Sequence, residues 1–399
     1  MSFSSRELMP QEEVLEVERH KQQLQIGIPK ETCLQEKRVA LSPDAVALLA
    51  EHDHEILVES GAGEGASYAD HDYSEAGAKI VYSAKDVFES DMIVKVEPPS
   101  LKEIEMMKHK QCLISALQLK TQSKEYFQKL MKKKVTAISF ENMEDEDGIV
   151  PVVRSMSEIA GNTSVLIAAE YLSNANSGKG FMLGGVSGVP PTEVVIIGAG
   201  TVGTFAARTA MGLGASVKVF DKSLSKLRRL QGMLNNGPIY TCVVQPKILE
   251  KALMRCDVAI GAIRAQGGRT PTVVTEDMVK NMKAGSVIVD VSIDQGGCFE
   301  TSELTDHENP TFEKFDIIHY CVPNIASRVS RTASFSLSNI MAPVLISVGE
   351  YGGIDEILHR SEGVRKGLYV YNGTLVNKPI GEWFDLPYTE AHLLFNDDL

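Results

Sequence analysis

Three glycines near the middle of the chain stand at the spacing of a nucleotide-binding turn. Gly198, Gly200 and Gly203 form G-x-G-x-x-G directly after the apolar run EVVII. In a strand–turn–helix unit, the first glycine permits the turn, the second lets the backbone approach a pyrophosphate, and the third brings helix and strand together. The positive end of the helix then faces the anion. The segment predicts a dinucleotide site that includes Thr201 and Val202; the alternative is a tight turn with no ligand.

An acidic residue ends the next expected strand, ASVKVFD. Asp221 stands 23 residues after Gly198, where a carboxylate accepts hydrogen bonds from the ribose of a dinucleotide. The same carboxylate would repel a 2′-phosphate, so NAD is favoured over NADP. Lys222 follows directly and weakens this preference.

Two aspartates interrupt the apolar segment SVIVDVSIDQGG. Burying a carboxylate is costly unless it is paired or used, so we expect Asp290, within the strand, to be hydrogen-bonded and structural. Asp294 stands at the expected end of the strand, where open α/β sheets bind ligands. It could hold a water against a bound nicotinamide. A turn-forming aspartate before Gln-Gly-Gly is an equal alternative from spacing alone.

Two cations also stand where chemistry is conceivable. Lys95 interrupts the apolar run DMIVKVEPP and could reach a ligand, or it could be an edge-strand lysine. Arg38, in CLQEKRVALSP, could clamp a substrate carboxylate with two hydrogen bonds, or it could form a surface ion pair. His319 is interpreted as a packed residue. No histidine has the spacing of a metal ligand, so no metal is expected.

The composition excludes several classes of protein. The 399 residues are 43% hydrophobic and carry a net charge of −13, which fits two domains and argues against nucleic-acid binding. No apolar run approaches the roughly 18 residues of a membrane helix. The six cysteines are dispersed without a C-x-x-C pair, as in a reducing compartment. We therefore expect a soluble, cytoplasmic protein that acts on small molecules.

Short apolar runs alternate with helical patterns along most of the chain, which predicts parallel α/β sheets. A long helix is expected from Met156, with Ser157 at its start. The fold class is α/β, with two doubly wound domains, the second a Rossmann domain that binds NAD, and a cleft between them. The expected bounds are a polar extension over 1–23, a discontinuous substrate domain over 24–152 plus 331–399, and the Rossmann domain over 153–330.

These segments together resemble alanine dehydrogenase and the related soluble alpha portion of nicotinamide nucleotide transhydrogenase. The matching stretches include GIPKE, EKRVALSP, IVKVEPP, SMSEIAGN, VVIIGAGTVG, VDVSIDQGGCFE and HYCVPNI. They cover nearly everything except the first 23 residues, and IDQGGCFE is quite specific to alanine dehydrogenase. The resemblance implies two α/β domains with the active site between them. It also implies a homo-oligomer, usually a hexamer, without a membrane segment.

The resemblance also implies roles for single residues. Arg38 matches an arginine that binds the substrate carboxylate, and Lys95 matches a lysine that contacts the substrate. Asp294 matches the aspartate beside the nicotinamide that handles water or ammonia. Three further positions fall among the cofactor contacts: Ser157, Asp221 and Asn324.

One position departs from the family pattern. Gln118, in LISALQLK, stands where alanine dehydrogenases carry a histidine. Glutamine can hydrogen-bond a reacting atom but cannot titrate, so the proton is expected to leave by Asp294, Lys95 or solvent. Arg264 replaces an aliphatic residue near the expected nicotinamide side. The implied reaction is NAD-dependent oxidation of L-alanine to pyruvate and ammonia. Two alternatives stay open: another small 2-amino or 2-oxo acid, and an NAD(H)-binding transhydrogenase-like protein without turnover.

Overall fold

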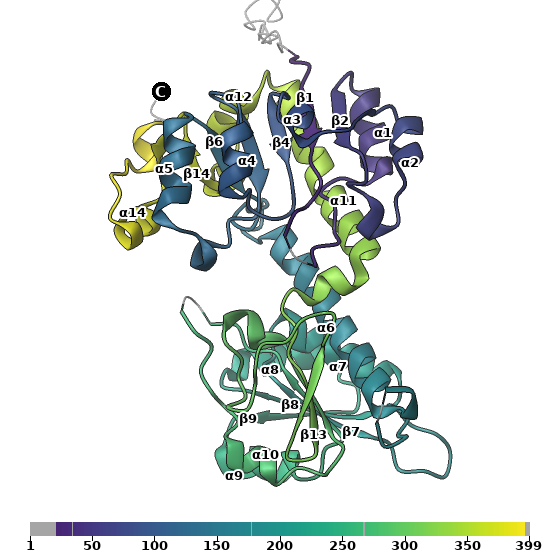
Figure 1. Ribbon diagram of the computed structural model, residues 1–399. Helices are drawn as coiled ribbons and strands as arrows, with labels where there is room; N and C mark the ends of the chain where they lie inside the picture. Colours follow the sequence, from purple (N-terminus) through teal and green to yellow (C-terminus); the bar gives the residue numbers. More distant parts are fainter. Residues whose placement is uncertain (1–20, 34, 177, 266–267, 396–399) are drawn as a thin grey trace, which may run out of the picture.

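The computed structural model describes residues 21–33, 35–176, 178–265 and 268–395. It consists of two α/β lobes, and two long helices lie at their junction (Figure 1). These helices are α6 (Pro151–Leu172) and α11 (Ser330–Glu350). Most of the predicted N-terminal extension, residues 1–20, lies outside the described residues.

The first lobe holds an eight-stranded sheet in the order β15-β14-β6-β5-β4-β1-β2-β3. The first six strands of the chain run parallel, and β14 lies antiparallel to β6 and β15. The strands are β1 (Gln25–Ile28), β2 (Glu55–Glu59), β3 (Lys79–Val81), β4 (Met92–Val94), β5 (Cys112–Ser115), β6 (Thr136–Ser139), β14 (Leu368–Tyr371) and β15 (Thr374–Leu375). The end of the chain therefore returns to the sheet of the first lobe.

The helices of the first lobe begin where the sequence supplies caps. Ser42 caps α1 through the amide of Ala45, and Pro43 takes the first helical position. Ser123 caps α5 in the same way. The helices are α1 (Pro43–Glu51), α2 (Asp70–Glu75), α3 (Ala84–Val87), α4 (Leu101–Met106), α5 (Lys124–Lys132), α12 (Ile354–Arg360), α13 (Glu362–Lys366) and α14 (Lys378–Phe384).

The second lobe holds a seven-stranded sheet in the order β12-β13-β11-β10-β7-β8-β9. Its strands are β7 (Glu193–Ile197), β8 (Ser216–Asp221), β9 (Ile239–Val243), β10 (Val258–Gly261), β11 (Val287–Asp290), β12 (Thr311–Lys314) and β13 (Ile317–Tyr320). Its helices include α7 (Thr201–Gly212), α8 (Leu224–Met233), α9 (Pro246–Leu253) and α10 (Glu276–Lys280). Five of these strands were predicted, from the segments EVVIIGAG, ASVKVFD, CDVAIGAI, SVIVDVS and DIIHYCV. The other two, β9 and β12, lie at the two edges of the sheet and were not predicted.

The two sheets share one winding order. In each sheet the first strand, β1 or β7, lies between the second and the fourth, so the strand order reverses beside it. Ligands of such sheets bind outside the carboxyl ends of the strands at this reversal. The prediction of two doubly wound α/β domains is confirmed.

One prediction about helices is wrong. The long helix α6 begins at Pro151 rather than at Met156, because proline is preorganised for the first helical turn.

Residues 325–350 form a helical segment that is long and apolar enough to cross a membrane, by length and composition alone, although half of its most apolar window is buried. Its buried residues Leu337, Met341 and Leu345 pack in the main core of the first lobe, as in the core helix of a soluble protein.

Candidate functional site

The glycine turn of the second lobe has the geometry that its spacing predicts. Gly198 directly follows β7 with φ +117°, a conformation that side chains rarely adopt, and a Cβ there would collide with the carbonyl of Ala262. A Cβ on Gly203 would collide with the carbonyl of Gly198. Both glycines are therefore required for the close packing of α7 against the turn.

The N-terminus of α7 is open on its outer side. Gly200 is the residue that precedes the helix, and a Cβ built on it meets nothing within 4 Å. The amides of Thr201, Val202 and Gly203 occupy the first turn, where no intrahelical acceptor exists. The turn thus offers unpaired donors and the positive helix end to an anion.

Asp221 supports this turn from the neighbouring strand. It ends β8, and its Oδ2 accepts a 2.7 Å hydrogen bond from the amide of Ala199 inside the turn. Its Oδ1 accepts a 2.7 Å bond from the amide of Ser223. Each carboxylate oxygen can accept a second hydrogen bond, so the group remains able to bind a ribose hydroxyl.

Ser157 lies two turns inside α6 rather than at its start. Its hydroxyl donates a 2.7 Å hydrogen bond to the carbonyl of Val153 within the same helix. Further along α6, Gly161 allows close approach to α7, because a Cβ there would collide with the carbonyl of Val202. The helix that carries Ser157 therefore packs directly against the glycine turn, residues 198–203, which is called the nucleotide turn below.

A polar cluster forms where the carboxyl ends of strands from both lobes meet. Its centre is Arg38, which follows β1 and clamps Glu36 with two bonds, Nε to Oε1 at 2.8 Å and Nη2 to Oε2 at 2.6 Å. Nη2 also lies 3.4 Å from Oε1 of Glu97, just beyond β4. The three side chains are 11%, 1% and 8% exposed, respectively, so this is a buried network and not a surface ion pair.

Gln118 joins the cluster from the end of β5. Its Nε2 donates a 2.5 Å hydrogen bond to Oε2 of Glu97. Gln118 has φ +45°, and Oε2 of Glu141 accepts its backbone amide at 3.0 Å. The left-handed backbone and the Glu141 anchor aim the glutamine at Glu97.

Asn324 connects the cluster to the second lobe. It follows β13, and its side-chain amide donates a 2.7 Å hydrogen bond to Oε2 of Glu36. Its backbone amide donates a 3.0 Å hydrogen bond to Oδ1 of Asp294. The structure therefore brings together four predicted residues in one chain of contacts: Arg38, Gln118, Asp294 and Asn324.

The strand that carries Asp290 ends earlier than predicted and leaves Asp294 outside it. β11 ends at Asp290, and Asp294 lies in the short 3₁₀ helix Val291–Gln295. Asp290 is 1% exposed and accepts hydrogen bonds from the amides of Ser292 and Cys298. These bonds turn the chain out of the strand, so the structural interpretation of Asp290 is confirmed.

The carboxyl groups of the cluster have divergent acidities. Burial raises the pKa of Glu36, but the bonds and charge of Arg38 outweigh this and lower it to about 2. Burial, followed by the negative charge of Glu36, raises the pKa of Glu97 to about 8. Asp294 is reached by solvent, yet protein atoms crowd it and this desolvation raises its pKa, against the Asn324 amide and the charge of Arg38. The cluster thus pairs a permanent anion, Glu36, with one carboxyl group, Glu97, that can carry a proton near neutrality.

The side chain of Lys95 is buried between two acidic residues of the first lobe. β4 lies between β1 and β5, so the edge-strand interpretation is wrong. The Lys95 side chain is 1% exposed, and its Nζ lies 3.1 Å from Oε1 of Glu103 and 3.3 Å from Oε2 of Glu31. Glu31 in turn accepts the amides of Val96, at 2.5 Å, and Glu97, at 3.3 Å. Lys95 is held behind the cluster, where it supports the backbone that carries Glu97.

Glu36 and Glu97 were missed in the sequence. Glu36 stands two residues before Arg38, and Glu97 stands at the carboxyl end of a central parallel strand. Position at the carboxyl end was the available signal for Glu97. His319 was interpreted correctly: it is buried, with Nε2 2.9 Å from the hydroxyl of Thr301 and Nδ1 2.9 Å from the carbonyl of Ile317.

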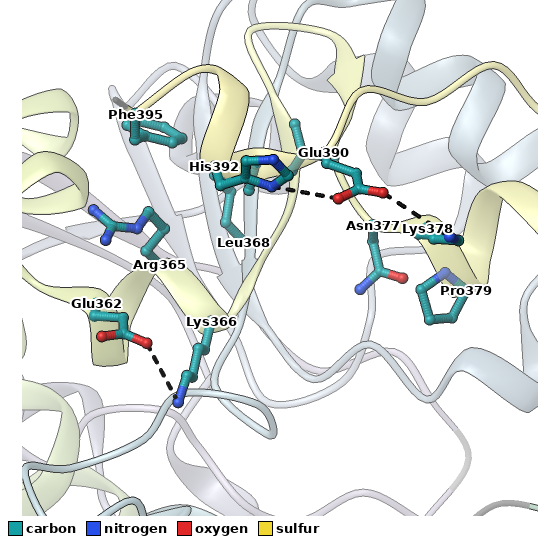
Figure 2. Close-up of a pocket in the computed structure, with 12 residues that line it drawn as sticks. Glu362, Arg365, Lys366, Leu368, Asn377, Lys378, Pro379, Glu390, His392 and Phe395 are labelled. Carbon is teal, nitrogen blue, oxygen red and sulfur yellow. Dashed lines mark ion pairs between the residues drawn. The ribbon is translucent and has the colours of Figure 1, made fainter. Parts of the chain in front are cut away.

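A hollow lies on the first lobe, between α13, β14 and α14 (Figure 2). Its charged side chains face one another in pairs, since Lys366 lies 3.6 Å from Glu362, and Lys378 lies 4.0 Å from Glu390. It includes none of the residues singled out in the sequence. The polar cluster between the lobes is therefore the better candidate site.

The chain is similar to known proteins over most of its length. The family model for the alanine dehydrogenase/PNT N-terminal domain matches residues 27–160, and the model for the C-terminal domain matches residues 164–378. Alanine dehydrogenase of Methanococcus maripaludis is 39% identical over 374 residues, 93% of this chain and 100% of the relative. Alanine dehydrogenase of Staphylococcus epidermidis is 40% identical over 367 residues, 92% of this chain and 98% of the relative.

Solved structures give the same result. A structure of L-alanine dehydrogenase superposes with a TM-score of 0.85 at 39% identity, covering 91% of this chain and 99% of the other. The transhydrogenase from Sinorhizobium meliloti superposes with a TM-score of 0.78 at 24% identity and shows the shared fold alone. With both family models covering most of its length, the chain belongs to the alanine dehydrogenase/PNT family.

Proposed function

We propose that this protein catalyses the reversible, NAD-dependent oxidative deamination of L-alanine to pyruvate and ammonia. The observation that carries the proposal is the continuous contact from Arg38 through Glu36 and Asn324 to Asp294. This contact supports the proposal because it joins the guanidinium of Arg38 to the lobe that holds the nucleotide turn. The relatives named alanine dehydrogenase, at about 40% identity over most of their length, support the same activity.

The nucleotide turn fits a dinucleotide. Its open Gly200 and the uncapped amides of the first turn of α7 suit a pyrophosphate. Asp221 suits the adenosine ribose and disfavours a 2′-phosphate, so the cofactor is NAD. Bound there, the nicotinamide supplies the acceptor for the hydride of the substrate. Ser157 and Asn324 are proposed to complete the contacts from α6 and from the end of β13.

Arg38 is proposed to hold the carboxylate of the substrate. Glu36 engages its Nε and Nη2, which fixes the plane of the guanidinium. Among the described residues, Nη1 has only the weak acceptor Met156 Sδ at 3.6 Å, so a carboxylate can take its place. Holding the substrate by one end in a fixed plane supplies the orientation on which much of the rate depends.

Asp294 is proposed to hold the water that hydrates the iminium of the substrate. Its Oδ1 is fixed by the amide of Asn324, and its raised pKa lets it accept a proton from that water and return it to the leaving nitrogen. Gln118 orients the reacting oxygen or nitrogen. Lys95 acts as a positioning residue, through Glu31 and the backbone of Glu97.

Several coarser expectations are carried forward in the same proposal. The substrate domain comprises 24–152 plus 331–399 and the nucleotide domain 153–330, although helix α6 runs through the first of these bounds. The protein assembles as a homo-oligomer, a hexamer by resemblance, and works in the cytoplasm.

The test is NADH oxidation by the purified protein with pyruvate plus ammonium, beside glyoxylate, 2-oxobutyrate and a control lacking any oxo acid. Fastest turnover with pyruvate supports the proposal. Turnover with another acid but not with pyruvate replaces alanine by that substrate. NADH binding without turnover on any acid favours a nucleotide-binding protein without its own chemistry.

A further inference from the structure

We infer that Glu97 is the acid–base residue of the site and carries the proton that Gln118 cannot. This inference deepens the proposed function and rests on it. It assigns a catalytic role to a carboxyl group that neither the glycine turn nor the aspartates of the second lobe account for.

The position of Glu97 is the first support. It follows β4, which lies beside β1 at the reversal of the strand order, where such sheets bind ligands. Its Oε1 lies 3.4 Å from Arg38 Nη2, and its Oε2 accepts the 2.5 Å bond from Gln118 Nε2. The carboxyl therefore lies between the group proposed to hold the substrate carboxylate and the group proposed to orient the reacting atom.

The surroundings of Glu97 keep it protonated near neutrality. The charged and titratable groups around it lie on the segment after β1 and at the end of its own strand: Glu31, Cys33, Glu36, Arg38 and Lys95. Arg38 donates two hydrogen bonds to Glu36, at 2.8 and 2.6 Å, and lies farther from Glu97, at 3.4 Å, so its charge stabilises the carboxylate of Glu36 more than that of Glu97. Burial and the charge of Glu36 raise the pKa of Glu97 to about 8, against the charge of Arg38. Such a group can both give and take a proton at physiological pH.

Other members of the cluster cannot replace it. Gln118 does not titrate. Glu36 has a pKa of about 2 and remains an anion. Lys95 is enclosed by Glu31 and Glu103. Asp294 is proposed to accept one proton of the attacking water. The second proton, on the hydroxyl group of the carbinolamine, needs another acceptor in the same turnover.

The step starts from alanine bound as the neutral amine, whose ammonium proton has already passed to solvent. Once the α-hydride of this amine has left, water adds to the iminium and one of its protons passes to Asp294. The C–N bond of the carbinolamine then breaks, and the nitrogen takes that proton and leaves as ammonia. The remaining hydroxyl proton passes to the carboxylate of Glu97 as the C=O bond of pyruvate forms. Glu97 then releases this proton to solvent.

The sign of the pH dependence follows from this step. Deamination requires Glu97 as the carboxylate, so kcat for alanine should rise tenfold per pH unit below about 8 and level off above it. Amination of pyruvate requires the protonated acid, so its kcat should fall above the same pH. The ammonium group of the substrate titrates at higher pH and affects KM in every variant alike.

The experiment compares Glu97→Gln, Glu97→Asp and the control Glu105→Gln, in the full-length protein. Glu105 is an exposed carboxylate on α4. Glu97→Gln should lower kcat by about 10²–10⁴-fold and change the KM for alanine by only a few-fold. In this variant the rise of kcat with pH below about 8 should disappear. Glu97→Asp should recover part of the rate and keep a pH-dependent rise of kcat. Glu105→Gln should match the unaltered protein. Gln118→His in the Glu97→Gln background should restore turnover, since it supplies a titratable group to the same place.

The outcomes separate the inference from the proposed function. Turnover of alanine with kcat and pH profile unchanged in Glu97→Gln overturns the inference and leaves the proposed function standing. A lower kcat in Glu97→Gln that still rises with pH below about 8 also overturns the inference. Loss of a carboxylate with a purely structural role would lower the rate without removing this pH dependence. An unaltered protein that turns over no alanine at any pH overturns the proposed function and the inference with it.

Discussion

The side-chain amide of Asn324 donates a 2.7 Å hydrogen bond to Glu36, and this bond joins the carboxyl end of a strand in the second lobe to the cluster of the first. The backbone amide of the same residue binds Asp294. One residue therefore sets the distance between the group that fixes Arg38 and the group proposed to hold water. Asn324 adopts φ +51°, a conformation that asparagine tolerates better than most residues.

The first prediction concerns this bridge. Asn324→Gly keeps the backbone conformation and the amide to Asp294, so only the bond to Glu36 is lost, and kcat/KM should fall by roughly tenfold. Asn324→Asp sets a carboxylate against the ionised Glu36, and the loss should reach roughly 100-fold, since like charges in contact repel. Steady-state kinetics of both variants test this order. Equal activity of Asn324→Asp and the unaltered protein would exclude the bridge.

The second prediction concerns the guanidinium. Arg38→Lys keeps the positive charge but cannot hold Glu36 and a substrate carboxylate in one plane, so the KM for alanine should rise by roughly 10–100-fold. Arg154→Lys, on the exposed side of α6, is the matched control and should leave KM unchanged. An Arg38→Lys variant with the KM of the unaltered protein would remove Arg38 from substrate binding.

The third prediction separates a structural role of Lys95 from a substrate contact. Lys95→Met leaves Glu31 and Glu103 buried without their cation, which should lower the free energy of unfolding by about 3–5 kcal/mol. Lys102→Met, exposed on α4, should change it by less than about 0.5 kcal/mol. Chemical denaturation measures both. A Lys95→Met protein of normal stability with a greatly raised KM would instead support the direct contact that the family resemblance implies.

The fourth prediction concerns the choice of cofactor. Asp221→Asn removes the negative charge at the end of β8 but keeps an oxygen for the amide of Ala199. The ratio of kcat/KM for NAD to that for NADP should therefore fall by at least about tenfold, because repulsion of a 2′-phosphate is lost. An unchanged ratio would show that another residue selects the cofactor.

The nucleotide turn could be predicted because its requirements are local. Gly198, Gly203 and Asp221 are needed by one strand, one turn and the next strand, and each is readable at fixed spacing. The start of α6 was misplaced because the serine at 157 was taken as a start signal, whereas Pro151 already provides one six residues earlier. Short edge strands such as β9 were missed because the alternation of their side chains is weak.

Only part of the polar cluster between the lobes could be predicted from the sequence. Arg38, Asp294 and Asn324 were singled out, but what joins them is Glu36, and no spacing rule connects an acid after β1 with an amide after β13. The direction of the Lys95 side chain could not be predicted either. The sequence does not show whether this side chain faces Arg38 or Glu103, and in the structure it faces Glu103. Tertiary contacts between distant strand ends settle both, and the sequence alone does not contain their geometry.

The central claim is that the α-hydrogen of alanine is transferred to a nicotinamide held by the second lobe. The most direct measurement incubates the purified protein with L-[2-²H]alanine and NAD and analyses the products by mass spectrometry. We expect one deuterium in the reduced nicotinamide, none in pyruvate and a slower rate than with unlabelled alanine. Pyruvate formed without deuterium in the nicotinamide, or no pyruvate at all, would contradict it.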